Sequence, residues 1–172
     1  IHLPFHENNP VSAARERFAG YREALASCGI EFDAGLTREG AFGEDAGVVA
    51  GERAARELLR MPDRPTALVC CNDYLAIGAL RALEEAGLNV TGDVAVVGHD
   101  DIPAARYMRP SLTTVTQPMT QAREVGMRFL LQKLSEGKTG PQDGPDAPAR
   151  LRCAPIYRES SGSLQAQDTE HS

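Results

Sequence analysis

Tryptophan is absent from this chain, and aromatic residues make up only 5% of it. The chain also lacks any apolar run approaching the roughly 18 residues that span a bilayer, and it does not begin with a basic segment followed by an apolar core. Lysine and arginine are scattered singly, and the formal net charge is −6, so no basic stripe for a phosphate backbone is visible. These absences argue against a membrane-spanning segment and against strong binding of nucleic acid by this segment alone.

Cysteine and histidine are too dispersed to indicate a metal centre. There is no Cys-x-x-Cys pair and no cluster of His and Cys at the spacing of metal ligands. The cysteines are Cys28, Cys70, Cys71 and Cys153, and the histidines are His2, His6, His99 and His171. We therefore expect buried, reduced thiols and imidazoles that lie at the surface or are hydrogen-bonded, with no metal and no cofactor.

The common catalytic signatures are missing as well. The chain contains no G-x-S-x-G elbow, no P-loop, no G-x-G-x-x-G after a strand and no H-E-x-x-H. One enzymatic alternative stays open at "VVGHDD", because phosphoryl transfer and hard cations use clustered carboxylates at strand ends. That alternative needs a cationic partner, which the sequence does not mark, so we expect a protein that is not an enzyme.

The chain does contain a regular alternation of strands and helices. From apolar spacing, helix caps and glycine stops, the expected helices are residues 10–28, 46–60, 73–87 and 120–136. The expected strands lie near 30–35, at 66–71 and within 93–101. This alternation predicts β-α-β units, and hence an α/β fold with a parallel sheet flanked by helices on both faces. Residues 137–149 are rich in Gly, Pro and Asp and predict a loop.

Polar side chains follow two of the predicted strands. Asn72 and Asp73 end the strand in "LVCCNDYLAIGAL", and His99, Asp100 and Asp101 end the next. Because ligands of open parallel sheets bind beyond the carboxyl ends of the strands, both groups are expected to project into one crevice. The alternative for the first group is a helix N-cap, an explanation that suits Asp73 better than Asn72, since one cap suffices. The alternative for the second is a turn with solvated carboxylates.

A third polar group lies in the first predicted helix. Arg15 and Arg17 are two residues apart and therefore face different ways. Arg17 lies near the start of the helix, close to the carboxyl edge of the sheet if this is a β-α unit. A guanidinium there can donate a fork of hydrogen bonds to vicinal hydroxyls or to a carboxylate.

Several of these segments together resemble one protein family. "RPTALVCCND", "AIGALRALEEAGL", "VTGDVAVVGHDD" and "PSLTTVTQP" occur in the order seen in the effector-binding region of bacterial transcriptional regulators of the LacI/GalR family. "RERFAGYREAL" before them and "YRESSG" after them extend the resemblance over about residues 11–160. Each segment alone is weak, but the combination is specific.

The resemblance implies a fold like that of the type I periplasmic sugar-binding proteins, in which two α/β lobes clamp a small effector. This chain is similar to the C-terminal lobe over residues 1–160, with a crossover and a helix of the other lobe at about 114–136. Residues 161–172 are expected to form a disordered tail. The DNA-binding headpiece and most of the N-terminal lobe are expected to be absent, which fits a chain that opens at Ile1 without an initiator Met.

The resemblance also implies a set of effector-binding residues. Arg17 matches an arginine that contacts effector hydroxyls or a carboxylate, and Asn72 matches a polar residue at a strand end. Asp100 matches an acidic residue that accepts from a sugar hydroxyl or a base nitrogen. Phe42 falls where an aromatic ring often stacks on the ligand, and Gln117 matches the glutamine of the crossover. The chain departs from the family where His99 replaces the usual Tyr or Phe, and in the adjacent cysteines before Asn72.

The function implied by the resemblance is that of a cytoplasmic, ligand-responsive transcriptional repressor. Its small-molecule effector would be a sugar or sugar derivative, and it would bind operator DNA as a homodimer through the absent headpiece, with no membrane contact. Candidate dimer contacts are the apolar positions of 76–88 and the irregular stretch 107–110. The alternative is a periplasmic sugar-binding protein of an uptake system, which has the same fold.

Overall fold

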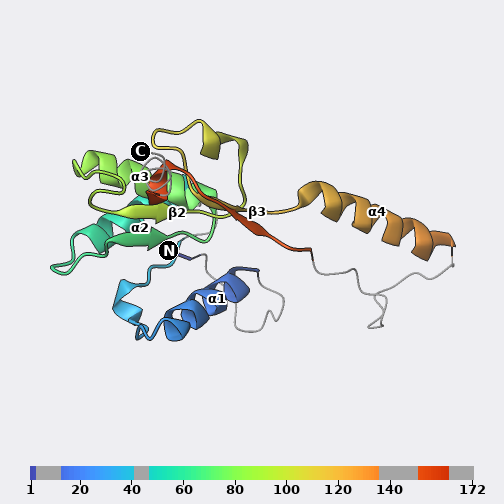
Figure 1. The fold of residues 1–172 in the computed structure, drawn as a ribbon, viewed down its shortest axis with the longest axis horizontal. Helices are drawn as coiled ribbons and strands as arrows, with labels where there is room; N and C mark the ends of the chain where they lie inside the picture. The colour runs from blue at the N-terminus through green and yellow to red at the C-terminus, as the bar shows by residue number, and fades with distance from the viewer. Residues whose placement is uncertain (3–12, 41–46, 136–150, 163–172) are drawn as a thin grey trace, which may run out of the picture. The chain divides into compact units, whose positions relative to one another are not determined.

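The computed structural model describes residues 1–2, 13–40, 47–135 and 151–162 (Figure 1). The helices are α1 (Ala13–Ser27), α2 (Val48–Leu59), α3 (Asp73–Glu85) and α4 (Met119–Ser135), and the strands are β1 (Ala67–Val69), β2 (Ala95–Val97), β3 (Thr114–Thr116) and β4 (Ala154–Ile156). Short 3-10 helices are η1 (Ala34–Leu36), η2 (Pro103–Arg106) and η3 (Glu159–Ser161). The chain divides into two compact units, residues 1–115 with 155–172 and residues 116–154, and each is described by itself.

A parallel sheet forms the centre of the first unit, as the sequence predicts. β1 and β2 pair in parallel, with Leu68 opposite Val96. Backbone hydrogen bonds continue beyond the strands, from the N–H of Cys70 to the carbonyl of Val97 at 2.8 Å and from the N–H of Gly98 to the carbonyl of Thr113 at 2.9 Å. The second bond continues the ladder from β2 toward β3, which also pairs with β4. The carboxyl ends of neighbouring strands therefore meet at one edge.

Two expectations, about a strand near 30–35 and about the cysteines, need correction. No strand forms near 30–35, because the carboxylate of Asp33 accepts a hydrogen bond of 2.7 Å from the N–H of Gly35 and caps η1 instead. Asp and Asn favour such local bonds to the backbone over a strand ladder. The expectation of buried thiols is confirmed for Cys70 and Cys71 and wrong for Cys28 and Cys153, which are exposed.

The core lies between the strands and the pair α2 and α3. It is made largely of small and aliphatic side chains on these elements: Ala50, Ala55, Leu58, Leu68, Leu75, Ala76, Ala79, Leu80, Ala82, Leu83, Val94, Val96 and Leu112. The abundance of alanine allows the two helices to approach closely. In Figure 1, α3 and α1 lie on opposite sides of the strands.

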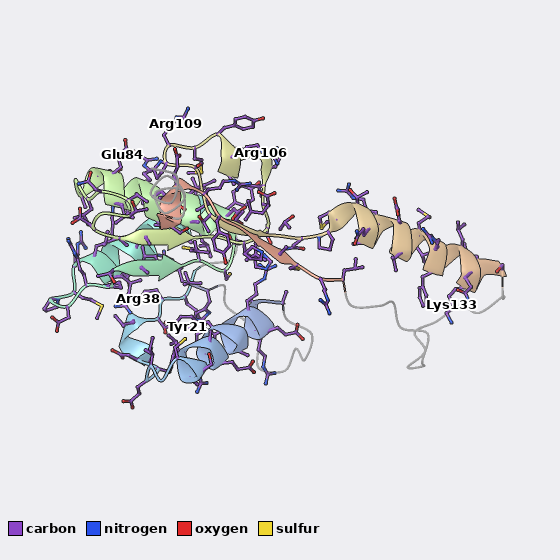
Figure 2. All side chains as sticks on the ribbon, in the orientation of Figure 1. Tyr21, Arg38, Glu84, Arg106, Arg109 and Lys133 are labelled. Carbon is purple, nitrogen blue, oxygen red and sulfur yellow. The ribbon has the colours of Figure 1, made fainter. Side chains whose placement is uncertain are left out.

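α1 is fixed by an aromatic cluster and contains no fully buried residue. The ring of Phe18 lies 5.8 Å from that of Phe32 in an edge-to-face arrangement and 4.8 Å from the imidazole of His2. Tyr21, labelled in Figure 2, stands 6.5 Å from Phe32. Pairs of this geometry stabilise by about 0.5–1.5 kcal/mol beyond their area. Because Phe18 is held in this way, its neighbour Arg17 is directed to the strand ends.

The segment after β4 is attached firmly to the start of β3. Ser160 is fully buried, and its hydroxyl donates to the carbonyl of Val96 at 2.6 Å and accepts from the N–H of Thr113 at 2.8 Å. The carboxylate of Glu159 accepts from the N–H and the hydroxyl of Ser111, and these bonds lower the pKa of Glu159. The hydroxyl of Ser161 lies 2.7 Å from that of Thr113. The closing "YRESSG" is therefore a structural part of the first unit.

In the second unit, α4 contains no buried residue, and its apolar side chains Met127, Leu130, Leu131 and Leu134 are more than half exposed. Within the described part of the chain, no helix combines the length and apolar character needed to cross a membrane. Phe42 and the predicted loop at 137–149 lie outside the described residues, as do residues 163–172.

The crossing of α2 over α3 depends on two glycines. A Cβ at Gly78 would collide with the carbonyl oxygen of Val48, and one at Gly51 would collide with the carbonyl oxygen of Leu75. The backbones of the two helices are therefore in contact, and no neighbouring side chain can move aside to relieve the clash.

We predict that Gly78→Ala destabilises the protein by about 1–3 kcal/mol, the usual cost of overpacking, although alanine favours a helix over glycine by about 0.5–1 kcal/mol. Gly20→Ala is the matched control, because nothing lies within 4 Å of a Cβ at Gly20 in α1. The control should leave the protein equally or more stable. Urea unfolding of both variants measures the difference, and a Gly78→Ala protein as stable as Gly20→Ala would contradict the close crossing.

Candidate functional site

The first strand end places Asn72 at the N-cap of α3. Its side-chain oxygen accepts a hydrogen bond of 2.8 Å from the N–H of Leu75, and its backbone is extended, with φ −151°. The sequence analysis gave a helix cap as the alternative explanation of this pair and favoured Asp73 for it; the cap is Asn72 instead. Asp73 is the first helical residue, where its charge faces the positive end of the helix dipole.

Asp73 is fully buried instead of projecting into the crevice. One carboxylate oxygen accepts from the hydroxyl of Thr114 at 2.6 Å and the other from the N–H of Ile102 at 2.9 Å. Burial raises the pKa of Asp73, an effect that these two hydrogen bonds oppose and the nearby charges of Asp100 and Asp101 increase. Gly98 makes room for the carboxylate, since a Cβ there would collide with it. Asp73 is therefore a structural tie between α3, β3 and the loop after β2.

Asp101 also has a structural role. Its carboxylate accepts a hydrogen bond of 2.6 Å from the guanidinium of Arg158, and the two side chains are only 12% and 13% exposed. A second guanidinium, that of Arg106 on η2, which is labelled in Figure 2, lies near the same carboxylate. Its distance from the other carboxylate oxygen of Asp101 is 4.0 Å. Arg158 also donates to the carbonyl of Leu112 at 2.7 Å. The expectation that all the polar residues of both strand ends project into one crevice is therefore wrong for Asp73 and Asp101.

Arg17 and Asp100 are brought together at the strand ends. One guanidinium nitrogen of Arg17 lies 3.2 Å from a carboxylate oxygen of Asp100, and the other donates to the carbonyl of Cys71 at 2.5 Å. The same oxygen of Asp100 lies 2.9 Å from Nδ1 of His99. The side chains of Arg17 and Asp100 are 25% and 29% exposed. This group, which we call the strand-end cluster, comprises Arg17, His99 and Asp100.

The backbone at Asp100 is strained. Its φ is 116°, and that of Asp101 is 50°, values that non-glycine residues rarely adopt. The N–H of Asp100 is held by the carbonyl of Val115 at 2.9 Å, and the side chain of Asp101 is held by Arg158. Strain of this kind persists only where the surroundings over-determine it, and it concentrates at functional sites.

The other residues expected at the effector site are Asn72, Phe42 and Gln117, and the structure places only the first of them at the strand ends. Asn72 directly follows Cys71, whose carbonyl binds Arg17, so it belongs to the same strand end. Phe42 lies outside the described residues, and Gln117 belongs to the second unit. The sequence analysis expected His99 to project into the crevice but did not name it among the effector-binding residues. Its position next to Asp100 is the signal that was available.

The chemistry of these residues suits binding better than catalysis. A guanidinium, a carboxylate and an amide supply donors and acceptors for a small polar molecule. The thiol of Cys70 is no nucleophile at neutral pH, because burial raises its pKa to about 11. In the described ranges, no group of three His, Cys, Asp or Glu side chains is placed to hold a metal ion.

Comparison with known proteins identifies the class. Residues 1–161 match the family model of the periplasmic binding protein-like domain, and the chain belongs to that family. It is similar to the effector-binding domain of LacI-family transcriptional regulators.

Among the curated relatives, the ribose operon repressor of Haemophilus influenzae is 35% identical over 127 residues, which are 74% of this chain and 37% of that protein. The HTH-type transcriptional repressor PurR of Vibrio atlanticus is 35% identical over 125 residues, 73% of this chain and 36% of that protein. The chain thus spans little more than a third of the length of these relatives.

The solved structures that match this chain include other transcriptional regulators. A LacI-family transcriptional regulator from Sanguibacter keddieii matches with a TM-score of 0.77 at 31% identity, covering 94% of this chain and 58% of that one. A complex of the transcriptional regulator CelR with cellobiose matches with a TM-score of 0.75 at 34% identity, covering 92% of this chain and 46% of that one.

We predict that Thr114→Val destabilises the protein by about 1–3 kcal/mol, because the buried carboxylate of Asp73 loses a donor. Since that hydrogen bond lowers the pKa of Asp73, its loss raises the pKa further above the ordinary value of 3.8. A carboxyl whose pKa is higher in the folded than in the unfolded protein stabilises the fold while it is protonated, and this contribution is lost as the pH rises through the folded-state pKa. The deficit should therefore be smallest below pH 3.8 and grow as the pH rises.

The matched control is Thr66→Val, which removes a hydroxyl from an exposed residue just before β1. Urea unfolding across the pH range measures both variants. A Thr114→Val deficit that shrinks as the pH rises would contradict the role assigned to Asp73.

Proposed function

We propose that this chain is the effector-binding part of a ligand-responsive transcriptional repressor. Residues 1–160 form the C-terminal lobe, with the crossover and a helix of the other lobe at 114–136. A sugar or sugar derivative binds where β1 and β2 end. The observation that carries this proposal is the hydrogen-bonded pair of Arg17 and Asp100, which joins α1 to the end of β2 while both side chains stay partly exposed.

The pair is suited to a polyhydroxylated ligand. A guanidinium donates through a rigid fork, and a carboxylate accepts from several hydroxyls, so each neighbouring pair of sugar hydroxyls meets a donor and an acceptor. Arg17 is oriented before any ligand arrives, because it already donates to the carbonyl of Cys71. Asn72 adds an amide at the same strand end, Phe42 an aromatic face and Gln117 a polar group from the crossover.

The named relatives support a regulator that binds a sugar. One is called the ribose operon repressor, and the CelR structure contains cellobiose. The alternative is a periplasmic sugar-binding protein of an uptake system. The matching curated proteins are named as repressors, which favours regulation over transport.

The assembly we propose is a cytoplasmic homodimer that contacts operator DNA through a headpiece outside this chain. It makes no membrane contact and catalyses no reaction. The lac repressor, solved as a dimer on its operator, matches with a TM-score of 0.72 at 30% identity, covering 87% of this chain and 42% of that one. Most apolar positions of 76–88 lie in the core, namely Ala76, Ala79, Leu80, Ala82 and Leu83, so they are unavailable for a dimer contact. The dimer contacts are therefore sought in 107–110, where Tyr107 is 78% exposed. The effector changes operator affinity only if it binds two conformations of the complete protein, one with high and one with low operator affinity, with different affinities.

We predict that Arg17→Ala and Asp100→Ala each raise the effector concentration for half-maximal response by about 10- to 100-fold. This is the usual cost of removing a hydrogen bond to a charged group. Operator affinity without effector should be unchanged. Fluorescence anisotropy of labelled operator, titrated with effector in the complete protein, measures both quantities.

Arg15→Ala is the control, because Arg15 is exposed and lies on the same helix two residues away. It should respond like the wild type. If the effector concentration for half-maximal response is unchanged in Asp100→Ala or in Arg17→Ala, the strand-end cluster does not bind the effector. This conclusion holds whatever the operator affinity of the variant.

A further inference from the structure

His99 has a defined place at the effector site. Its Nδ1 lies 2.9 Å from the carboxylate oxygen of Asp100 that Arg17 also contacts, and its side chain is 18% exposed. The backbone of His99 is anchored too, because its carbonyl accepts a hydrogen bond of 2.8 Å from the N–H of Asp73. The residue is thus held at its backbone and at one ring nitrogen, Nδ1, which is directed at Asp100.

We propose that His99 is a positioning residue, which orients Asp100 for the effector through Nδ1–H and makes effector affinity depend on its own protonation. This inference rests on the proposed function and adds a proton-linked control to the same site. It concerns a neutral, hydroxylated effector, one of whose hydroxyls donates to Asp100.

The direction of the pH effect follows from the hydrogen bond. Neutral His99 donates from Nδ1, which fixes the carboxylate while leaving it a full negative charge. Protonated His99 turns this hydrogen bond into an ion pair and places a second cation beside Asp100, next to Arg17. Asp100 then accepts more weakly from a ligand hydroxyl. Effector affinity should fall as the pH falls, because imidazole changes its charge between pH 5 and 8.

Other charged groups lie near the strand ends. They come from α1 (Arg17), from α3 (Asp73), from the loop after β2 (Asp100, Asp101 and Arg106) and from the segment after β4 (Arg158). Burial raises the pKa of Asp73, so a comparison between two pH values in the wild type does not by itself isolate histidine. All of these groups are also present in the His99 variants, so a difference in pH dependence between the wild type and a His99 variant isolates His99.

The first test needs no effector. In the complete protein labelled with ¹⁵N-histidine, the neutral imidazole of His99 should carry its proton on Nδ1, and Asp100→Ala should remove that preference. The His99 resonance is assigned from its absence in His99→Asn. A proton on Nε2 in the wild type, or a tautomer that Asp100→Ala leaves unchanged, overturns the proposal.

The second test is calorimetric titration with D-ribose, D-glucose, D-galactose and cellobiose at pH 6 and pH 8.5. Wild-type affinity for the sugar that binds should fall at the lower pH by about 5-fold, the low end of coupling between two sites. His99→Asn keeps a donor near the place of Nδ1 but cannot titrate, so it should bind as the wild type does at pH 8.5 and show no pH dependence. His99→Phe should bind more weakly at both values.

These outcomes separate the two proposals. A His99→Asn profile that parallels the wild type overturns the role of His99, while the effects of Arg17→Ala and Asp100→Ala still stand for the site. Equal affinity of His99→Phe and wild type also overturns it. If no sugar of the panel binds, the sugar-binding function fails, and this inference fails with it.

Discussion

The buried carboxylate of Asp73 is the interaction on which the strand-end cluster depends. It receives the hydroxyl of Thr114 and the N–H of Ile102, so it joins α3 to β3 and to the loop after β2. An ionised group in this position costs free energy unless its oxygens are hydrogen-bonded, and both are. Gly98 is required beside it, because a side chain would occupy the space of the carboxylate. Asn72 and Asp100 flank this tie and are held in register by it.

The loop that carries Asp100 is held from several sides at once. Its backbone bonds to β3 at Val115, and its second aspartate bonds to Arg158 from the segment after β4. These contacts offset the strain of two successive residues with positive φ. The loop therefore presents Asp100 to Arg17 in a fixed orientation, and little reorganisation is needed when a ligand arrives. Preorganisation of this kind lowers the entropic cost of binding.

Sequence reasoning found the fold because it depends on a strong pattern, and it named Arg17 and Asp100 separately, from their positions and from the family resemblance, without pairing them. Alternating strands and helices give the parallel sheet, and the carboxyl ends of its strands bring distant polar residues together. It favoured Asp73 over Asn72 as a helix cap, because a choice between adjacent polar residues requires the first residue of the helix to be known exactly. It did not foresee that Asp101 is paired with Arg158, 57 positions away, because no local pattern marks such a contact.

The most direct test of the binding site is hydrogen–deuterium exchange of the complete protein, with and without a sugar that changes its affinity for operator. The site described above predicts slower exchange in peptides covering 13–27, 70–75 and 98–102, which hold Arg17, Asn72 and Asp100. Exchange that slows elsewhere and leaves these three segments unchanged would contradict it, because the effector would then bind away from the strand ends.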